Sequence, residues 1–274
     1  MSRALREWLD HVEGDALLRE PLRLRERLDA MDRMELLEEQ IGDRQLTARV
    51  GHLRDALEAI NQQLYGELRQ AIRQGRNAFA PWIDTLESEP CGDSYDYRDE
   101  LVSGVLAFDE PGDVEPLPPE MVFYQPTPAR HVFDLIRRTR LDERDVLVDL
   151  GSGLGIVPLL VAIATGARTV GVERSTAYVA AARACARRLG LERASFECID
   201  ARRADCSQGT LFYLYTPFTG EVMRTVLATL RREAEQRPLR VATFGPCTHV
   251  LAAEPWLRAI GDTQAERLAL FSAG

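Results

Sequence analysis

A glycine-rich turn follows an apolar run near the middle of the chain, in VLVDLGSGLG at residues 146–155. Asp149 ends the apolar run, and Gly151, Gly153 and Gly155 alternate after it. Glycine adopts positive φ without strain, and its missing Cβ leaves room for a ligand close to the backbone. The next run, IVPLLVAIATGA, is typical of a buried helix whose free N–H groups favour an anionic ligand group. The pattern therefore predicts a strand, a turn and a helix that bind a nucleotide-like ligand.

Glu173 ends the second apolar run, RTVGVE, and stands 18 residues after Gly155. A carboxylate in this place accepts hydrogen bonds from both hydroxyls of a ribose, and so it supports the nucleotide interpretation. A dinucleotide fingerprint needs G-x-G-x-x-G, but Ile156 occupies the position of the third glycine. This spacing disfavours a nicotinamide-dependent oxidoreductase.

The order FYQPTPARHVFDLI, VDLGSGLGIVPL, VGVE resembles the class I S-adenosylmethionine-dependent methyltransferases. It is also similar to the non-SET histone lysine methyltransferases of the disruptor-of-silencing family. The resemblance runs from about Tyr124 to the C-terminus. It does not extend to the histone substrate, because the Asn-rich acceptor motif expected after the fourth strand is absent.

The resemblance implies S-adenosylmethionine as the cofactor. In that family the glycine turn cradles the methionine moiety, and the acid that matches Glu173 holds the ribose. Asp200, at the end of the run ASFECID, matches the acid that binds the adenine amino group. Tyr124 and Thr127 lie in the segment that closes over the methionine end. With Asp149 and the three glycines, these residues form the expected cofactor site.

The acceptor side is expected at the ends of the fourth and fifth strands. YTPF, residues 215–218, sits where methyltransferases of bases and glutamine carry N-P-P-Y. Tyr215 replaces the Asn that recognises an amine, which argues against those substrates, while Phe218 could stack on a planar acceptor. His249 follows the fifth strand and is a candidate general base near neutral pH; His131, within a helix, is a weaker one. Tyr215, Phe218 and His249 are thus the candidate catalytic residues.

The expected fold is α/β, a Rossmann-like seven-stranded methyltransferase sheet with an N-terminal α-helical domain. ASFECI, TLFYLYT and RVATFG indicate further strands, and EPWLRAI and ERLALF are two last apolar runs. The resemblance implies that these runs complete the sheet, with the last strand inserted antiparallel. Thr127 is an expected N-cap for a helix over residues 128–138. The predicted domains are a helical domain at 1–86, an acidic Pro/Gly-rich connecting segment at 87–120, and the cofactor-binding domain at 121–274.

The helical domain contains an apolar seam with spacings of 4, 3, 4, 3 and 4, formed by Leu46, Val50, Leu53, Leu57, Ile60 and Leu64. This spacing is typical of a coiled-coil contact. A preceding helix is expected from Pro21 to Ile41, with Gly42 as its stop. The two helices would form a hairpin that needs more cover, from the catalytic domain or from a second subunit. An ordinary helical appendage and a homo-oligomer both remain open.

The composition limits the catalytic chemistries and the classes of partner that the chain can have. All 34 basic residues are arginine, which removes Schiff-base catalysis and a P-loop lysine. The net charge of −9 divides into −5 for residues 1–90, −8 for 91–120 and +4 for 121–274. A phosphate backbone needs clustered basic charge, which nothing before residue 120 offers, so nucleic acid is possible only for the C-terminal part and is not favoured as a partner. The five cysteines lack metal-ligand spacing and are interpreted as reduced thiols, with Cys185 and Cys198 in elements that look buried. We expect no metal site.

No run of about 20 apolar residues is present, and the N-terminus does not resemble a signal peptide, so a cytoplasmic protein without a membrane segment is expected. The main hypothesis is a methyltransferase that acts on an unidentified protein or small-molecule acceptor. The alternative is a non-catalytic S-adenosylmethionine-binding protein whose helical domain binds a partner.

Overall fold

The computed structural model of the chain describes residues 2–38, 41, 43–86, 88–112, 116 and 118–274. The helices are α1 (Ser2–Gly14), α2 (Leu24–Glu38), α3 (Arg44–Arg73), α4 (Ala80–Asp84), α5 (Tyr97–Leu106), α6 (Ala129–Thr139), α7 (Ile156–Thr165), α8 (Thr176–Leu189), α9 (Gly220–Ala234) and α10 (Cys247–Ala252). The strands are β1 (Val146–Leu150), β2 (Arg168–Glu173), β3 (Ala194–Cys198), β4 (Leu211–Tyr215), β5 (Leu239–Phe244), β6 (Arg258–Ala259) and β7 (Ala269–Ala273).

The strands form one seven-stranded sheet in the order β3-β2-β1-β4-β5-β7-β6. The first five are parallel, and β7 pairs antiparallel with β5 and β6, as the family resemblance implies. The strand order reverses between β1 and β4, where α/β sheets of this kind open a crevice at the carboxyl ends of the strands. The pairing of Asp149 with Tyr213 across β1 and β4 lies beside this crevice.

Apolar side chains cover both faces of the sheet. Helices α6, α7 and α8 pack on one face and share a core with α4, α5 and the C-terminal half of α3. The Phe79 and Phe133 rings, whose centroids are 5.8 Å apart, join the segment before α4 to α6 within that core. Helices α9 and α10 pack on the other face. The sheet therefore has helices on both sides, and one of its cores extends into the N-terminal half of the chain.

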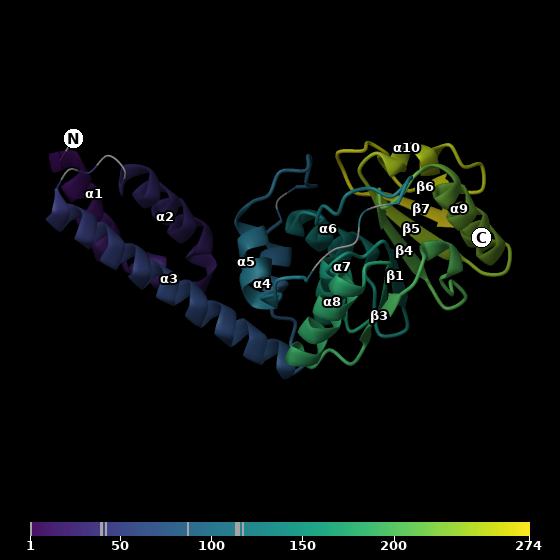
Figure 1. Ribbon diagram of the computed structural model, residues 1–274, viewed down its shortest axis with the longest axis horizontal. Coiled ribbons are helices and arrows are strands. Elements are labelled where there is room, and N and C mark those ends of the chain that lie inside the picture. The colour runs from purple at the N-terminus through teal and green to yellow at the C-terminus, as the bar shows by residue number, and fades with distance from the viewer. Residues whose placement is uncertain (1, 39–40, 42, 87, 113–115, 117) are drawn as a thin grey trace.

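Helices α1, α2 and the N-terminal half of α3 lie at the end of the molecule opposite the sheet, and the C-terminal end of α3 reaches α8 (Figure 1). The predicted seam on α3 is buried except at Ile60, which is partly buried. The two-helix hairpin was an incomplete prediction, because α1 supplies Leu5, Leu9 and Val12 as further cover. The α-helical part of the preceding helix begins at Leu24 rather than Pro21 and ends at Glu38. Its expected stop, Gly42, lies outside the described residues.

Arg27 of α2 is fully buried within this helical unit. Its guanidinium donates to Asn61 Oδ1 at 2.6 Å and to the carbonyl oxygens of Leu18 at 2.8 Å and Glu20 at 2.6 Å. Since an unpaired buried charge is costly, these partners explain how the arginine is tolerated and why α2 keeps one position on α3.

A side chain of helix α5 caps both its own first turn and the start of the next helix. Asp99 Oδ2 accepts from the N–H of Asp96, while its Oδ1 accepts from the N–H of Ala129 at 2.8 Å. Helix α6 thus begins at Ala129 and is capped from α5. Thr127 is not the N-cap, because its hydroxyl is hydrogen-bonded to Tyr213 instead.

Three of the cysteines are buried, and Cys91 and Cys198 are exposed. The expectation that Cys198 is buried is wrong, because β3 is the edge strand of the sheet. Within the described residues, no helix is long and apolar enough to cross a membrane. The central part of the expected connecting segment, residues 113–115 and 117, lies outside the described residues, and the three-domain division stays a prediction.

Candidate functional site

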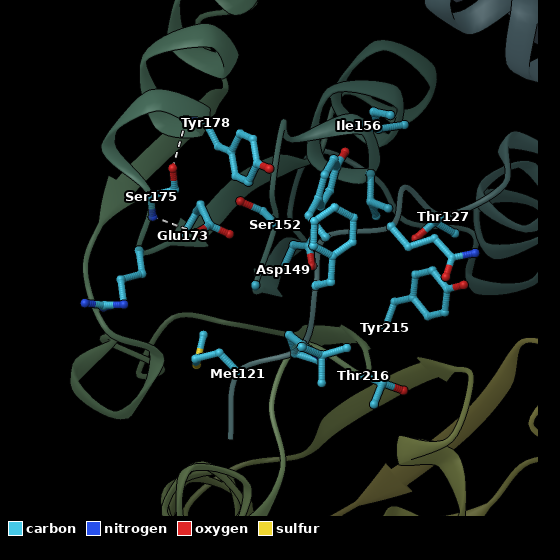
Figure 2. A pocket seen from close by; sticks show the side chains of 18 of the residues that line it. Met121, Thr127, Asp149, Ser152, Ile156, Glu173, Ser175, Tyr178, Tyr215 and Thr216 are labelled. Carbon is cyan, nitrogen blue, oxygen red and sulfur yellow. Dashed lines mark hydrogen bonds between the residues drawn. The ribbon is translucent and has the colours of Figure 1, made fainter. Parts of the chain in front are cut away.

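A cavity of about 570 Å³ opens at the carboxyl edge of β1, β2 and β4. Cavities that bind small molecules commonly have volumes of this size. Figure 2 shows Glu173, Ser175 and Tyr178 on one side, Thr127 and Tyr215 on the other, and Asp149 and Ser152 between them. The other lining residues come from the glycine turn, the start of α7, the residue after β2, the end of β4 and the segment before α6: Pro116, Pro118, Met121, Val122, Phe123, Tyr124, Gln125, Gly151, Ile156, Val157, Arg174, Tyr213, Thr216 and Pro217.

The glycine turn has the backbone that its sequence predicts. Gly151, Gly153 and Gly155 have φ of 92°, 52° and 79°. The close approach that excludes a Cβ comes from protein side chains: a Cβ on Gly153 would lie 2.0 Å from the Tyr124 ring, and one on Gly151 would lie 2.2 Å from Pro217 Cβ. The turn must therefore be glycine-rich for the cavity walls to pack against it.

Glu173 lies at the end of β2 and holds the turn in place. Its Oε2 accepts from the N–H of Gly153 at 3.0 Å, and its Oε1 accepts from the N–H of Ser175 at 2.7 Å. The remaining acceptor capacity of the carboxylate faces the cavity, where hydroxyl groups of a ligand could use it. This is where the sequence predicts the ribose acid.

Asp149 is 3 % exposed and lines the same cavity. Burial, followed by the negative charge of Glu173, raises the pKa of Asp149 well above its usual range. Ser152 Oγ is also buried and has no hydrogen-bond partner among the described residues. A cationic group beside Asp149 and a polar group beside Ser152 would supply the partners that these side chains lack.

The start of α7 also faces the cavity, through Ile156 and Val157. The first N–H groups of a helix have no partners within the helix, and the helix dipole adds positive potential there. This end of the cavity suits a carboxylate. No group of three or more His, Cys, Asp or Glu side chains placed to hold a metal ion occurs in the described part of the chain.

Asp200 lies in a smaller recess that adjoins the cavity at Gly151 and Glu173. Its carboxylate accepts from the N–H and the Nε of Arg202, both at 2.9 Å, and the Arg202 guanidinium lowers the pKa of Asp200. Asp149, the glycine turn, Glu173 and Asp200 thus follow one another along the carboxyl edge from β1 to β3, in the order that the sequence predicts for a cofactor site.

The opposite side of the cavity is formed by the end of β4. Burial raises the pKa of Tyr215 to about 12. Thr216 has a φ of 33°, which is unusual for a β-branched residue. Two bonds hold it there, because Cys247 N–H donates to Thr216 Oγ1 at 3.0 Å and Thr216 N–H donates to Cys247 Sγ at 3.3 Å. The start of α10 therefore fixes the loop that carries Tyr215.

Phe218 does not line the main cavity. It is 1 % exposed, pairs with Met121 through an isolated bridge, and packs in the core beneath α9. Its expected place in the acceptor wall is therefore wrong, because pairing with the segment before α6 turns the ring into the core. The exposed aromatic residue at the mouth is Phe123 instead, which is 77 % exposed.

Neither candidate histidine reaches the cavity. His249 is exposed on α10 and is absent from the cavity wall. His131 is buried, its Nε2 is 2.7 Å from the carbonyl oxygen of Gly92, and burial lowers its pKa. A neutral histidine in this position donates to that carbonyl, so His131 ties the segment before α5 to α6.

Sequence reasoning missed Tyr213 and Tyr178. The Tyr213 hydroxyl is 2.9 Å from Thr127 Oγ1, both groups are buried, and both residues line the cavity. The Tyr178 ring lies 5.1 Å from the Tyr124 ring. The period of two along a strand could have identified Tyr213, because it shares a face of β4 with Tyr215.

The family model of the histone methylation protein DOT1 matches residues 122–197, which include the glycine turn and Glu173. A comparison with curated proteins found no match.

The chain also resembles solved structures of several methyltransferases. An RNA methyltransferase from Salinibacter ruber in complex with S-adenosylhomocysteine is 28 % identical, with 54 % of this chain and 92 % of that chain covered and a TM-score of 0.42. The precorrin-6y C5,15-methyltransferase from Geobacter metallireducens is 12 % identical, with 57 % and 93 % covered and a TM-score of 0.42. The tRNA (uracil-54, C5)-methyltransferase from Pyrococcus abyssi is 18 % identical, with 55 % and 39 % covered and a TM-score of 0.40.

Proposed function

We propose that this chain, a member of the class I S-adenosylmethionine-dependent methyltransferase superfamily, methylates an uncharged group of a protein or small molecule that enters its cavity beside Tyr215. The observation that carries the proposal is the division of one cavity into two chemical halves. Charged and backbone donor groups lie at β1, β2 and α7, whereas the end of β4 and the segment before α6 supply uncharged side chains.

The charged half fits the cofactor. Glu173 would accept from the ribose hydroxyls, Asp149 would face the ammonium group, and the first turn of α7 would bind the carboxylate. Asp200 would accept from the adenine amino group. Tyr124 lies over Gly153 and closes this half, whereas Thr127 lies on the opposite side of the cavity with Tyr215 (Figure 2). When bound, S-adenosylmethionine supplies a methyl group that its sulfonium already activates.

The uncharged half determines what the acceptor can be. Tyr215 is a poor base near neutral pH, because burial raises its pKa to about 12. Among the described residues that line this half, Val122, Phe123, Gln125, Thr216 and Pro217 do not titrate. An acceptor atom must therefore arrive with a free lone pair or lose its proton to water. Orientation then remains as the main contribution of the protein, and well-oriented reactants lower a barrier by about 7–11 kcal/mol.

The described residues of the uncharged half include no effective base near neutral pH, and this gives weight to the alternative. In that alternative the chain is a non-catalytic protein that binds S-adenosylmethionine and uses α1, α2 and α3 to bind a partner. Self-association through these helices stays a prediction, and sedimentation equilibrium of the full chain would test it.

The test of the proposed function is transfer of a labelled methyl group. The full chain is incubated with labelled S-adenosylmethionine and a cell extract, which is then separated into protein, nucleic acid and small molecules. Label in the protein or small-molecule fraction supports the proposal. Label in nucleic acid contradicts the acceptor class, and label in no fraction despite cofactor binding by calorimetry favours the non-catalytic alternative.

A further inference from the structure

Residues 120–124, here called the strap, run along the mouth of the cavity and pair with the loop after β4. The N–H of Thr219 donates to the carbonyl oxygen of Glu120 at 2.8 Å, and the N–H of Val122 donates to that of Pro217 at 3.2 Å. Met121 forms a bridge with Phe218 between these two bonds. The strap is thus joined by backbone hydrogen bonds to the loop that contains the acceptor-side residues.

The N-terminal end of the strap is fixed on α9. The Glu120 carboxylate accepts from the N–H groups of Glu221 at 3.0 Å and Val222 at 3.2 Å, at the start of that helix. A Cβ on Gly220 would lie 2.3 Å from Glu120 Oε1. Glycine at this position leaves the space that the carboxylate occupies.

The C-terminal end of the strap is fixed on the cofactor side. The Tyr124 ring lies directly over Gly153 and beside Tyr178. Phe123 therefore lies between two anchored residues, Val122 and Tyr124, and its position in the chain is restrained on both sides. Its side chain is nevertheless 77 % exposed and lines the cavity.

Phe123 presents a flat apolar face at the mouth of the cavity, and among the described residues no other aromatic ring pairs with it. Burying a side chain such as Phe stabilises a complex, and aromatic pairs gain further from stacking or edge contacts. Val122, which is 40 % exposed, extends the apolar surface beside it. The charged residues that line the cavity, Asp149, Glu173 and Arg174, belong to β1 and to the end of β2 and the residue after it.

We propose that Phe123 is the acceptor-recognition residue, and that it stacks on a planar, uncharged group, an aromatic or heteroaromatic ring, which it orients toward the transferable methyl group. This inference rests on the proposed function and names the class of acceptor. It assigns to the strap the role that the sequence suggested for Phe218. The acceptor would be recognised by the face of the Phe123 ring rather than by an ion pair. Substitutions of Phe123 by residues with and without a ring can therefore distinguish planar stacking from simple apolar contact.

The experiment compares initial rates of labelled methyl transfer into the protein and small-molecule fractions of one extract. The variants are Phe123→Ala, Phe123→Leu and Phe123→Tyr. Ile260→Ala is the matched control, because Ile260 is also a large exposed apolar residue, at 43 % exposure, and it does not line the cavity. Calorimetry with S-adenosylhomocysteine measures the cofactor affinity of each variant.

We expect Phe123→Ala and Phe123→Leu to lower the rate at limiting acceptor by at least about tenfold, and Phe123→Tyr to retain at least about half of it. S-adenosylhomocysteine affinity should change by less than about threefold in all variants, and Ile260→Ala should behave as the wild type. Wild-type rates in Phe123→Ala would overturn the inference and leave the proposed function intact. A Leu variant as active as the wild type would overturn the planar acceptor, whereas no labelling by the wild-type chain would refute the proposed function itself.

Discussion

Substitutions of Glu173 test both cofactor affinity and the stability of the glycine turn. Its carboxylate accepts from the N–H groups of Gly153 and Ser175 and also faces the cavity. Hydrogen bonds to a charged group contribute about 1.5–3 kcal/mol each, and about 1.4 kcal/mol is a factor of ten in affinity. Glu173→Ala should therefore weaken S-adenosylhomocysteine binding by at least about tenfold.

The same substitution also removes the partners of two backbone N–H groups. Leaving a buried donor without a partner costs about 1–3 kcal/mol, and each kcal/mol lowers the melting temperature of a chain of this size by about 2–4 °C. Glu173→Gln keeps one side-chain acceptor oxygen but loses the charge, so it should retain more of the thermal stability while it still loses cofactor affinity. Comparison of the two variants shows how much of the lost affinity comes from the turn.

Titration calorimetry with S-adenosylhomocysteine and thermal unfolding without ligand are the two measurements. Glu197→Ala is the control, since Glu197 is an exposed glutamate on the neighbouring strand β3 and lies outside the cavity wall. Wild-type affinity in folded Glu173→Ala would refute the assignment of the ribose site. A similar loss in the control would show that the effect reflects net charge alone.

Three further substitutions test the cavity and the packing around it. Burial raises the pKa of Asp149, so the folded chain without ligand holds the carboxyl proton more tightly than the unfolded chain does. The resulting contribution to stability is complete in acid and is lost as the pH rises through the folded-state pKa. Urea unfolding between about pH 5 and about pH 8 should therefore show a greater loss of stability for the wild type than for Asp149→Asn. A Cβ on Gly104 would lie 2.3 Å from a tyrosine ring of α3, whereas one on Gly66 would meet nothing within 4 Å. Gly104→Ala should therefore lower the free energy of unfolding by about 1–3 kcal/mol, and Gly66→Ala should raise it by about 1 kcal/mol. Equal effects of the two substitutions would contradict the packing of α5 on α3. Gly153→Ala should weaken S-adenosylhomocysteine binding at least about tenfold in calorimetry, while Gly75→Ala, which also has positive φ but an open surround, should leave it unchanged; a loss in both would indicate general strain.

The charged half of the cavity could be predicted because its sequence signals are local. A strand that ends in Asp149, alternate glycines and a carboxylate after the next strand are read within about 30 residues, which is the length of one strand-helix-strand unit. Parallel pairing of β1 and β2 then brings Glu173 to Gly153, as the hydrogen bond between them shows. Local sequence and topology agree here, and so the prediction of these elements is confirmed.

The uncharged half of the cavity could not be predicted in the same way, because contacts between distant segments decide which of its side chains are buried. The sequence around Phe218 gives no sign that Met121 will pair with it, yet that bridge decides which of the two phenylalanines faces water. Thr127 also has the pattern of an N-cap, but Tyr213 of β4 takes its hydroxyl and Asp99 of α5 caps the helix instead. In both cases a tertiary partner overrides a correct local preference.

Helix α3 spans 30 residues and belongs to two apolar cores, one that it shares with α1 and α2 and one that continues through α5 and α6 to the sheet. Local opening of a protein follows such boundaries between cooperative units. The N-terminal half of α3, which packs on α1 and α2, can therefore exchange its amide hydrogens when these helices detach. The C-terminal half, here called the inner half, is protected until the sheet opens. Proteolysis that begins at the N-terminus should stop within α3, and the smallest stable fragment must retain its inner half together with α5, whose Asp99 caps α6. The cooperative unit that contains the sheet accordingly begins in sequence long before the glycine turn.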